Sequence, residues 1–234
     1  MMRIALMILR SIIAFPFYLI KLSYMGKHNW NLEKSYNYLR KLAIMANRKG
    51  RVTIEAHGVE NIPKENGFVF FPNHQGMYDV MAFLDSSPNP FAFVAKAELK
   101  NVPLLKQVMG ALHSLTIDRR DLRQSVKVID EIADRVSKGE NFLIFAEGTR
   151  SKKGNVMNDM KGGSFKCAIK AKAPIVPCAI VDAFVPFDVN SIKKVTVKIF
   201  YLEPLYYEDY KDMSSLEIAT LVKERIQAVL DANS

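Results

Sequence analysis

A histidine and an aspartate, five residues apart, follow an apolar run in the first third of the chain. The stretch FVFFP (residues 68–72) leads directly into NHQGMYD (residues 73–79), which contains His74 and Asp79. The apolar run predicts a short buried strand, with His74 on the loop at its carboxyl end. In open α/β sheets, catalytic and binding residues lie on such loops. A histidine oriented by a carboxylate is a general base that works near neutral pH without a metal. We therefore expect His74 to be a base and Asp79 its partner.

The spacing of this pair restricts how the two side chains can meet. On a regular helix five residues turn the chain by about 500°, which leaves the two side chains about 140° apart. His74 must therefore lie on a loop before a helix and fold back toward Asp79. Gly76 is expected to supply the flexibility for that turn.

A second apolar run also ends in polar residues. FLIFA (residues 142–146) is followed by Glu147, Gly148, Thr149 and Arg150. Gly148 lets the backbone approach a ligand, while Thr149 offers a hydroxyl and Arg150 a bidentate fork suited to phosphate. Solvated lysines follow in a glycine-rich stretch: Lys152, Lys153 and Lys161.

Two further blocks accompany these loops. SLTIDRR (residues 114–120) is a short strand ending in a charged pair, Asp118 and Arg119. APIVPCAI (residues 173–180) has no titratable group except a cysteine thiol. Its composition favours a packing element or an apolar wall for a substrate tail.

From residue 51 onward, the segments that must position these loops alternate between predicted strands and predicted helices. This alternation predicts an α/β domain with a mostly parallel or mixed central sheet flanked by helices. Continuously apolar strands indicate a sheet covered on both faces. The predicted strands are Val52–Ala56, Phe68–Phe71, Phe91–Ala95, Ser114–Ile117, Asn141–Phe145, Ile175–Ile180 and Val195–Phe200. The predicted helices are Met77–Leu84, Pro103–Ala111, Leu122–Ser137, Ser164–Lys170 and Ser214–Ala232.

Residues 1–50 carry nearly all of the excess charge. They hold nine basic residues and one acidic residue, whereas the other 184 residues hold 24 basic and 23 acidic residues. The run 4–20 is almost wholly apolar, with Arg10 and Pro16 inside it. Arg3, Arg10 and Lys21 are spaced at nearly whole helical turns, so they would share one stripe, with a kink at Pro16. This pattern predicts a helix lying in a membrane interface with its cations toward lipid headgroups.

A second N-terminal helix is expected to begin at Asn31, a good N-cap, and to reach about Arg48. The prediction is thus a two-helix membrane-associating motif over residues 1–50 and a catalytic domain over residues 51–234. A single spanning helix is the alternative for the apolar run. The two cysteines, Cys167 and Cys178, form no CxxC pair, which favours a reduced location facing the cytosol.

The four blocks, in this order, resemble the glycerolipid acyltransferases, and within them the 1-acylglycerol-3-phosphate (lysophosphatidic acid) acyltransferases. The resemblance covers about residues 51 to 200: Asn73-His74-x4-Asp79 is similar to the first block, Ile117-Asp118-Arg119 to the second, Phe145 to Ser151 to the third, and Ile175-Val176-Pro177 to the fourth. The second block departs from the pattern, because Ser114, Leu115 and Thr116 replace a bulkier apolar run.

This resemblance implies transfer of a fatty acyl group from a thioester, acyl-ACP or acyl-CoA, to the sn-2 hydroxyl of 1-acylglycerol 3-phosphate, giving phosphatidic acid for phospholipid biosynthesis. It implies direct transfer with His74 as general base and Asp79 orienting its ring, without a bound cofactor or metal. Backbone N–H groups from His74 to Gly76 are candidates for an oxyanion hole. The expected substrate-binding residues are Lys96, Arg119, Glu147, Gly148, Thr149 and Arg150.

The expected partners are membrane lipids and the acyl donor, with no nucleic acid, and the expected location is the cytoplasmic face of the cell membrane, by monotopic or peripheral attachment. Three alternatives remain open. The acceptor could be glycerol 3-phosphate or another lysophospholipid. The chain could be a metal-dependent phosphoesterase or lipase with His74, Asp79 and Glu147 as ligands. It could also be a nonenzymatic basic module that binds membranes.

Overall fold

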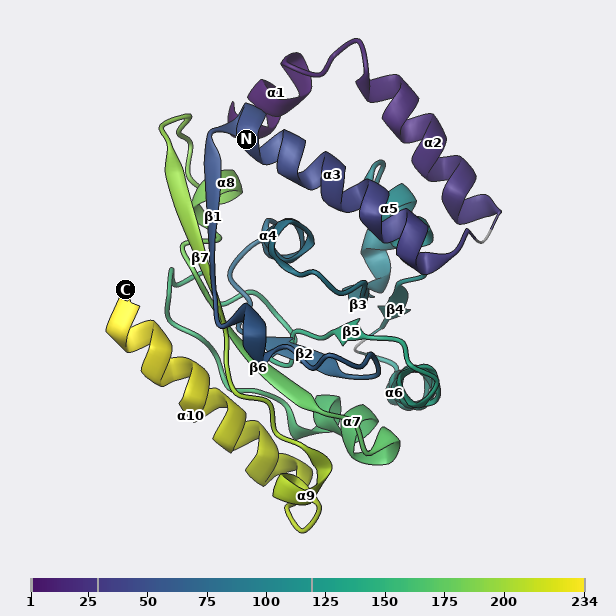
Figure 1. Cartoon of the computed structure of the whole chain (residues 1–234), viewed down its shortest axis with the longest axis vertical. Helices are drawn as coiled ribbons and strands as arrows, with labels where there is room; N and C mark the ends of the chain where they lie inside the picture. The colour runs from purple at the N-terminus through teal and green to yellow at the C-terminus, as the bar shows by residue number, and fades with distance from the viewer. Residues whose placement is uncertain (1, 29, 119, 234) are drawn as a thin grey trace.

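A seven-stranded sheet crosses the middle of the molecule in the order β1-β7-β6-β2-β5-β3-β4 (Figure 1). The structure is a computed structural model that describes residues 2–28, 30–118 and 120–233. Strands β6, β2, β5, β3 and β4 run parallel, while β7 is antiparallel to β6 and parallel to β1. The strands are β1 (Val52–His57), β2 (Val69–Pro72), β3 (Ala92–Lys96), β4 (Leu115–Ile117), β5 (Phe142–Leu143), β6 (Ile175–Val181) and β7 (Val195–Tyr201). The predicted mixed, mostly parallel sheet is confirmed, although β5 is shorter than predicted.

Helices cover both faces of this sheet, which explains why β2 and β6 consist of buried residues throughout. In β2 and the residue before it, Phe68 and Phe70 enter one core, whereas Val69 and Phe71 enter the other. The first core lies under α3 (Leu32–Gly50), α4 (Asp79–Ser86) and α5 (Leu105–Ala111). The second lies under α6 (Leu122–Ser137), α7 (Lys166–Ala171) and α10 (Ser215–Asn233). The result is a three-layer arrangement with the sheet in the middle (Figure 1).

Short helices fill the connections between these elements. They are η1 (Val59–Asn61), η2 (Ala97–Asn101), η3 (Gly162–Phe165), α8 (Val185–Asp188) and α9 (Tyr207–Tyr210).

Local signals account for the ends of the longer helices. The side chain of Asp121 accepts a hydrogen bond from Gln124 N (2.9 Å) at the start of α6, and Gly139 takes a positive φ of 89° just after its end.

The N-terminal segment contains three helices rather than the predicted two. The apolar run forms α1 (Met2–Leu9) and α2 (Phe15–Lys27), and Pro16 lies in the first turn of α2 instead of kinking a continuous helix. The predicted N-cap is confirmed, because the side chain of Asn31 accepts a hydrogen bond from Lys34 N (3.2 Å) at the start of α3.

The predicted stripe of three outward-facing cations is wrong for Arg3, whereas Arg10 and Lys21 are exposed. Arg3 is buried and donates hydrogen bonds to the carbonyls of Gly50 and Lys193 (2.5 and 2.7 Å). Arg10 donates to the carbonyl of Lys49 (2.7 Å). These two guanidinium groups donate hydrogen bonds to backbone carbonyls at the C-terminal end of α3, which have no partner within the helix. Helical spacing alone does not predict this contact.

Residues 1–50 also contribute to the core shared with the sheet. Leu22 of α2 and Tyr36 of α3 are buried in the same cluster as Phe70 of β2. Where α2 crosses α5, a Cβ atom on Gly26 would lie 2.9 Å from the carbonyl carbon of Gly110, so the two backbones approach closely. Within the ranges described, none of the helices combines the length and apolar character needed to cross a membrane.

Candidate active site

The two loops singled out by the sequence meet at one edge of the sheet. His74 follows β2 and Glu147 follows β5, and these strands are parallel neighbours. Asp79 is the first residue of α4, directly after the loop that carries His74. Ligands of open α/β sheets bind at the carboxyl ends of strands, and this edge has that polarity.

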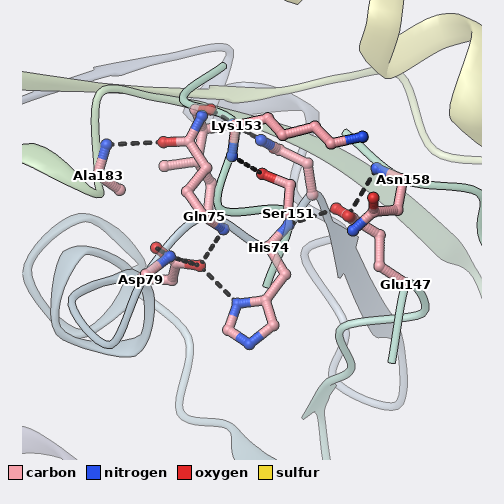
Figure 2. Close-up of polar contacts among 11 residues, drawn as sticks. His74, Gln75, Asp79, Glu147, Ser151, Lys153, Asn158 and Ala183 are labelled. Atoms are coloured by element: carbon pink, nitrogen blue, oxygen red, sulfur yellow. Dashed lines mark hydrogen bonds and ion pairs between the residues drawn. The ribbon is translucent and has the colours of Figure 1, made fainter. Parts of the chain in front are cut away.

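His74 and Asp79 form the expected pair. Nδ1 of His74 lies 2.7 Å from Oδ2 of Asp79, whose side chain is fully buried (Figure 2). The loop folds back as predicted, because Gln75 N and Gly76 N also donate to the Asp79 carboxylate (2.8 and 3.0 Å). Three donors therefore fix one carboxylate, and the carboxylate fixes the orientation of the imidazole ring.

Gly76 is needed for space rather than for an unusual backbone conformation. It is absent from the glycines with positive φ in this structure. A Cβ atom at this position would lie 3.2 Å from Cα of Phe184 and 3.3 Å from the carbonyl oxygen of Ala183. A side chain at position 76 would therefore require residues 183–184 to shift by a few tenths of an ångström.

One face of the His74 imidazole ring packs against an aromatic side chain. The His74 ring stacks on Phe145 with a centroid separation of 4.1 Å and an angle of 26°. The second ring nitrogen, Nε2, points away from Asp79 (Figure 2), and the His74 side chain is 19% exposed. This geometry leaves Nε2 accessible to a reacting group while Nδ1 is engaged.

Glu147 holds the backbone of the site rather than offering a free carboxylate. It is buried, and its two oxygens accept hydrogen bonds from His74 N (2.6 Å) and Asn158 N (2.8 Å). Burial raises the pKa of this carboxyl group, and the two N–H donors counteract part of that effect. Glu147 therefore joins the loop after β2 to residues 151–158.

The N–H groups suggested for an oxyanion hole are already engaged. His74 N donates to Glu147, while Gln75 N and Gly76 N donate to Asp79. The expectation that these three groups bind an oxyanion is therefore wrong for this conformation. Their role here is to hold the two carboxylates that position His74.

Amide side chains on both sides of His74 tie the loop to the end of β6. Asn73 both donates to and accepts from the backbone of Ile180 (3.0 and 2.7 Å). Gln75 accepts from Ala183 N (2.8 Å) and donates to Asn155 Oδ1 (2.7 Å). Sequence reasoning named Asn73 only as part of the first block and gave Gln75 no role. Two amides that flank the histidine directly are the sequence signal that points to them.

Asn155 extends the same network. Its side chain donates to Asp182 Oδ1 (3.0 Å) and accepts from Asp182 N (2.9 Å). Asp182 has a positive φ of 62°, a conformation that is uncommon for a residue with a side chain. The fourth block is thus a packing element whose end, at residues 180–183, anchors the catalytic loop.

An N-terminal helix also supports this loop. Tyr78, between His74 and Asp79, is fully buried and donates to Oδ1 of Asn47 in α3 (2.6 Å). Asn47 in turn donates to Asp85 of α4 (2.7 Å). The loop that carries the catalytic pair is therefore braced by α3 on one side and by β6 on the other.

Lys96 and Thr149, two of the expected substrate-binding residues, are more open than the catalytic pair. Lys96 ends β3 and forms an exposed ion pair with Glu98 (2.8 Å). Thr149 is exposed and Arg150 is half-buried in the loop after β5. Arg119, another of the expected substrate-binding residues, lies outside the described residues. Because β5 and β3 are neighbours in the sheet, Lys96, Thr149 and Arg150 share the edge that carries His74.

Lys161 belongs with this group, although the sequence suggested only a solvated charge. Gly148 has a positive φ of 74°, and a Cβ atom there would lie 3.0 Å from Nζ of Lys161 and 3.2 Å from its Cε. The backbone N–H of Lys161 donates to the carbonyl of Ala146 (2.9 Å). The absence of a side chain on Gly148 thus leaves room for a cation beside the loop that contains Arg150.

The two cysteines lie in the hydrophobic cores rather than on the loops that carry His74 and Arg150. Cys167 and Cys178 are fully buried, and burial raises the pKa of the Cys167 thiol to about 12. Among the residues with described placement, no three His, Cys, Asp or Glu side chains are grouped so that they could hold a metal ion. His74, Asp79 and Glu147 therefore do not form the ligand set that the phosphoesterase alternative requires.

Comparison with known proteins supports the resemblance seen in the motifs. Residues 53–181 match the family model described as Acyltransferase. A protein named 1-acyl-sn-glycerol-3-phosphate acyltransferase from Borreliella burgdorferi is 25% identical over 180 residues, which is 76% of this chain and 69% of that protein. The chloroplastic 1-acyl-sn-glycerol-3-phosphate acyltransferase BAT2 of Brassica napus is 30% identical over 54% of this chain and 37% of its own length.

A probable 1-acyl-sn-glycerol-3-phosphate acyltransferase of Mycoplasma genitalium is 35% identical over 55% of this chain and 49% of its own length. The chain thus spans well under two thirds of the length of several relatives that it matches. The crystal structure of the acyltransferase PlsC from Thermotoga maritima has the same fold, with a TM-score of 0.76, 23% identity and coverage of 96% of this chain and 91% of that one. Since the family model covers more than half of the sequence, this chain belongs to the Acyltransferase family.

Proposed function

We propose that this protein transfers a fatty acyl group from an acyl thioester to the sn-2 hydroxyl of 1-acylglycerol 3-phosphate, giving phosphatidic acid. The observation that carries the proposal is the 2.7 Å contact between His74 Nδ1 and Asp79, which leaves Nε2 accessible. The names of the relatives from Borreliella burgdorferi and Brassica napus support the choice of acceptor. The donor is acyl-ACP or acyl-CoA, each of which offers the same thioester.

The proposed reaction proceeds by direct attack. Nε2 of His74 takes the proton of the acceptor hydroxyl while that oxygen forms a bond to the thioester carbonyl carbon. The tetrahedral intermediate then collapses, the carbon–sulfur bond breaks, and the leaving thiolate takes the proton back from the imidazolium. Asp79 stabilises the imidazolium between these steps. General-base help of this kind contributes about 10²–10⁴-fold to the rate.

The proposal needs no acyl-enzyme intermediate. A covalent route would require an activated nucleophile beside a base. Burial raises the pKa of both cysteine thiols, which keeps them protonated near neutral pH. Neither cysteine is on the loops that carry His74 or Arg150, which favours direct transfer.

The phosphate of the acceptor is assigned to the cations at the same edge. Arg150 offers a bidentate fork, and Lys96 and Lys161 add positive charge on neighbouring segments. Arg119 is included on the motif resemblance alone. Glu147, Gly148 and Thr149 shape the loop around them. The basic, apolar segment of residues 1–50 is proposed to hold the enzyme on the cytoplasmic face of the cell membrane, where the acceptor resides.

The test is a detergent-solubilised assay with 1-acylglycerol 3-phosphate and either acyl-ACP or acyl-CoA. Wild-type protein should form phosphatidic acid with at least one donor, and His74→Ala should lose about 10²–10⁴-fold in kcat. A wild type inactive with both donors, or a fully active His74→Ala, would contradict the proposal. Glycerol 3-phosphate in place of the lysolipid tests the alternative acceptor.

A further inference from the structure

Exposed apolar side chains are unevenly distributed over this molecule. Outside residues 1–50, the large apolar side chains that the structure describes as exposed fall into two groups. Tyr206 and Leu216 come after β7. All of the others come after the carboxyl ends of the five parallel strands, on the edge that carries His74.

We name this second group the catalytic rim and represent it by one or two residues from each strand end. Met77 follows β2, Leu104 follows β3, Val156 follows β5 and Ile192 follows β6, and the pair Leu122 and Val126 follows β4. Leu122, the first residue of α6, is 79% exposed. Exposed apolar side chains that recur among polar residues at one edge of the sheet favour a surface that contacts a partner or a membrane.

The charges on three of the five rim segments have a matching bias, whereas segment 182–194, after β6, holds two aspartates and two lysines. Segment 96–106 holds three lysines and one glutamate, segment 118–127 holds four basic and two acidic residues, and segment 147–161 holds four basic and two acidic residues. The segment 202–214, after β7 at the opposite edge, holds four acidic residues and one lysine. The partner of the catalytic rim should therefore be apolar inside and negatively charged at its surface.

The rim is continuous with the exposed apolar face of the N-terminal helices. Ile192 lines an apolar concavity of about 660 Å³ together with α1 residues such as Leu6 and Leu9. Arg3 fixes α1 to this region by donating to the carbonyl of Lys193 (2.7 Å). The exposed face continues into the turn between α1 and α2, where Ile13 is 85% exposed.

We infer that the catalytic rim is itself a membrane-contacting surface, so that the catalytic domain and not only its N-terminal helices rests on an anionic bilayer. The choice of a bilayer rests partly on the proposed function, since a lipid acceptor has to reach Nε2 of His74 from this edge. Apolar side chains supply insertion and the lysines and arginines supply attraction to anionic headgroups. Lipid would then enter the site directly from the surface that the rim covers.

The test compares two leucines in matched positions. Leu122 and Leu216 are both exposed and both lie in the first turn of a long helix, but only Leu122 is on the rim. Full-length protein is floated with vesicles of phosphatidylcholine alone or mixed with phosphatidylglycerol. Leu122→Ser with Val126→Ser should weaken binding to the mixed vesicles by about tenfold. Leu216→Ser should leave binding unchanged, and added salt should weaken binding of the wild type.

Two outcomes would overturn the inference. Equal binding by the rim variant and the Leu216→Ser control would show that the rim does not touch lipid. Unchanged vesicle binding with a raised KM for acyl-ACP alone would instead identify the α6 patch as a docking surface for an acidic carrier protein. Vesicle binding is measured without turnover. A wild-type protein that forms no phosphatidic acid, but whose vesicle binding is weakened by the rim substitutions, would contradict the proposed function and leave this inference standing.

A second measurement does not depend on removing apolar side chains. Both native cysteines are fully buried, so a cysteine placed at Leu122 or Leu216 can be labelled selectively with a polarity-sensitive dye. The dye on Leu122→Cys should report an apolar environment when vesicles are added, and the dye on Leu216→Cys should not. Identical responses from both positions would overturn the inference.

Discussion

In the loop after β2, the backbone N–H groups of His74, Gln75 and Gly76 all have carboxylate partners, and Asp79 and Glu147 are buried. At the end of β3 and in the loop after β5, by contrast, Lys96 is paired with an exposed Glu98, and Thr149 is exposed. The geometry of the His74–Asp79 pair is therefore fixed by the fold itself, whereas Lys96 and Thr149 are exposed to solvent. We infer from this difference that the fold fixes the catalytic pair in advance, whereas the cationic side chains become ordered when the phosphate of the acceptor binds.

The largest effect is expected where the fixed region is broken at its centre. Asp79→Asn should lower kcat by about 10²–10⁴-fold and leave the KM for the acceptor within a few-fold, because the amide no longer favours the Nδ1–H tautomer or stabilises the imidazolium. The measurement is steady-state kinetics with circular dichroism as the folding control. A kcat near that of wild type would mean that the fixed geometry is not what catalyses the reaction.

The open region should respond in KM rather than in kcat. Arg150→Ala should raise the KM for 1-acylglycerol 3-phosphate by about 10–100-fold, as expected for a lost charge-assisted hydrogen-bonded pair. Arg150→Lys should recover only part of this loss, because a point charge replaces a bidentate fork.

Two controls sharpen this prediction. Lys152→Ala, an exposed cation in the same loop, should change the KM by no more than a few-fold. A monoacylglycerol acceptor, which lacks the phosphate, should be used equally by wild type and Arg150→Ala. Equal KM values of these two proteins for the phosphorylated acceptor would remove Arg150 from the phosphate site.

A smaller effect is expected from the amide network that couples the two regions. Gln75→Leu removes the hydrogen bonds to Ala183 and Asn155 and should lower kcat by about tenfold. Asn155→Ala should act through the same network, so the double variant should be no worse than the more impaired single variant. Asn89→Ala, which removes an exposed amide contact to Asn66, is the matched control. Strictly additive losses would show that the network does not couple the loops.

The smallest effect concerns stability and its dependence on pH. Burial raises the pKa of Glu147 above its usual 4.5 in the folded protein. A raised folded-state pKa contributes stability that is present below 4.5 and is lost as the pH rises through the folded value. The free energy of unfolding of wild type, relative to Glu147→Gln, should therefore fall as the pH rises over that window.

Urea unfolding of both proteins at a series of pH values measures this difference. A relative stability that rises with pH would mean that the two N–H donors, from His74 and Asn158, outweigh burial and lower the pKa of Glu147.

The sequence predicted the elements of the sheet well, because the apolar runs of β2 and β6 are buried on both faces. It also placed His74 on a loop that folds back to Asp79. It could not show that Arg3 turns inward to carbonyls of Gly50 and Lys193, because those groups become neighbours only through tertiary packing. For the same reason it suggested an oxyanion role for N–H groups that the fold uses to hold two carboxylates.

The N-terminal helices illustrate the same limit. Apolar periodicity predicted a helix-rich segment, but nothing local indicated that Tyr36 would share a core with Phe70, or that Asn47 would accept a hydrogen bond from Tyr78. Contacts between residues distant in sequence decide these roles. Gln75 and Asn155 escaped notice in the same way, since amides far apart in the chain carry no local pattern.

The most direct test of the account is the protonation state of the two ring nitrogens of His74, observed by ¹⁵N NMR in the neutral imidazole. The account predicts a proton on Nδ1, facing Asp79, and an unprotonated Nε2 that is free to accept a proton from the acceptor hydroxyl. Asp79→Asn should shift the population toward the other tautomer. A wild-type ring with its proton on Nε2 would contradict the assignment of His74 as the general base.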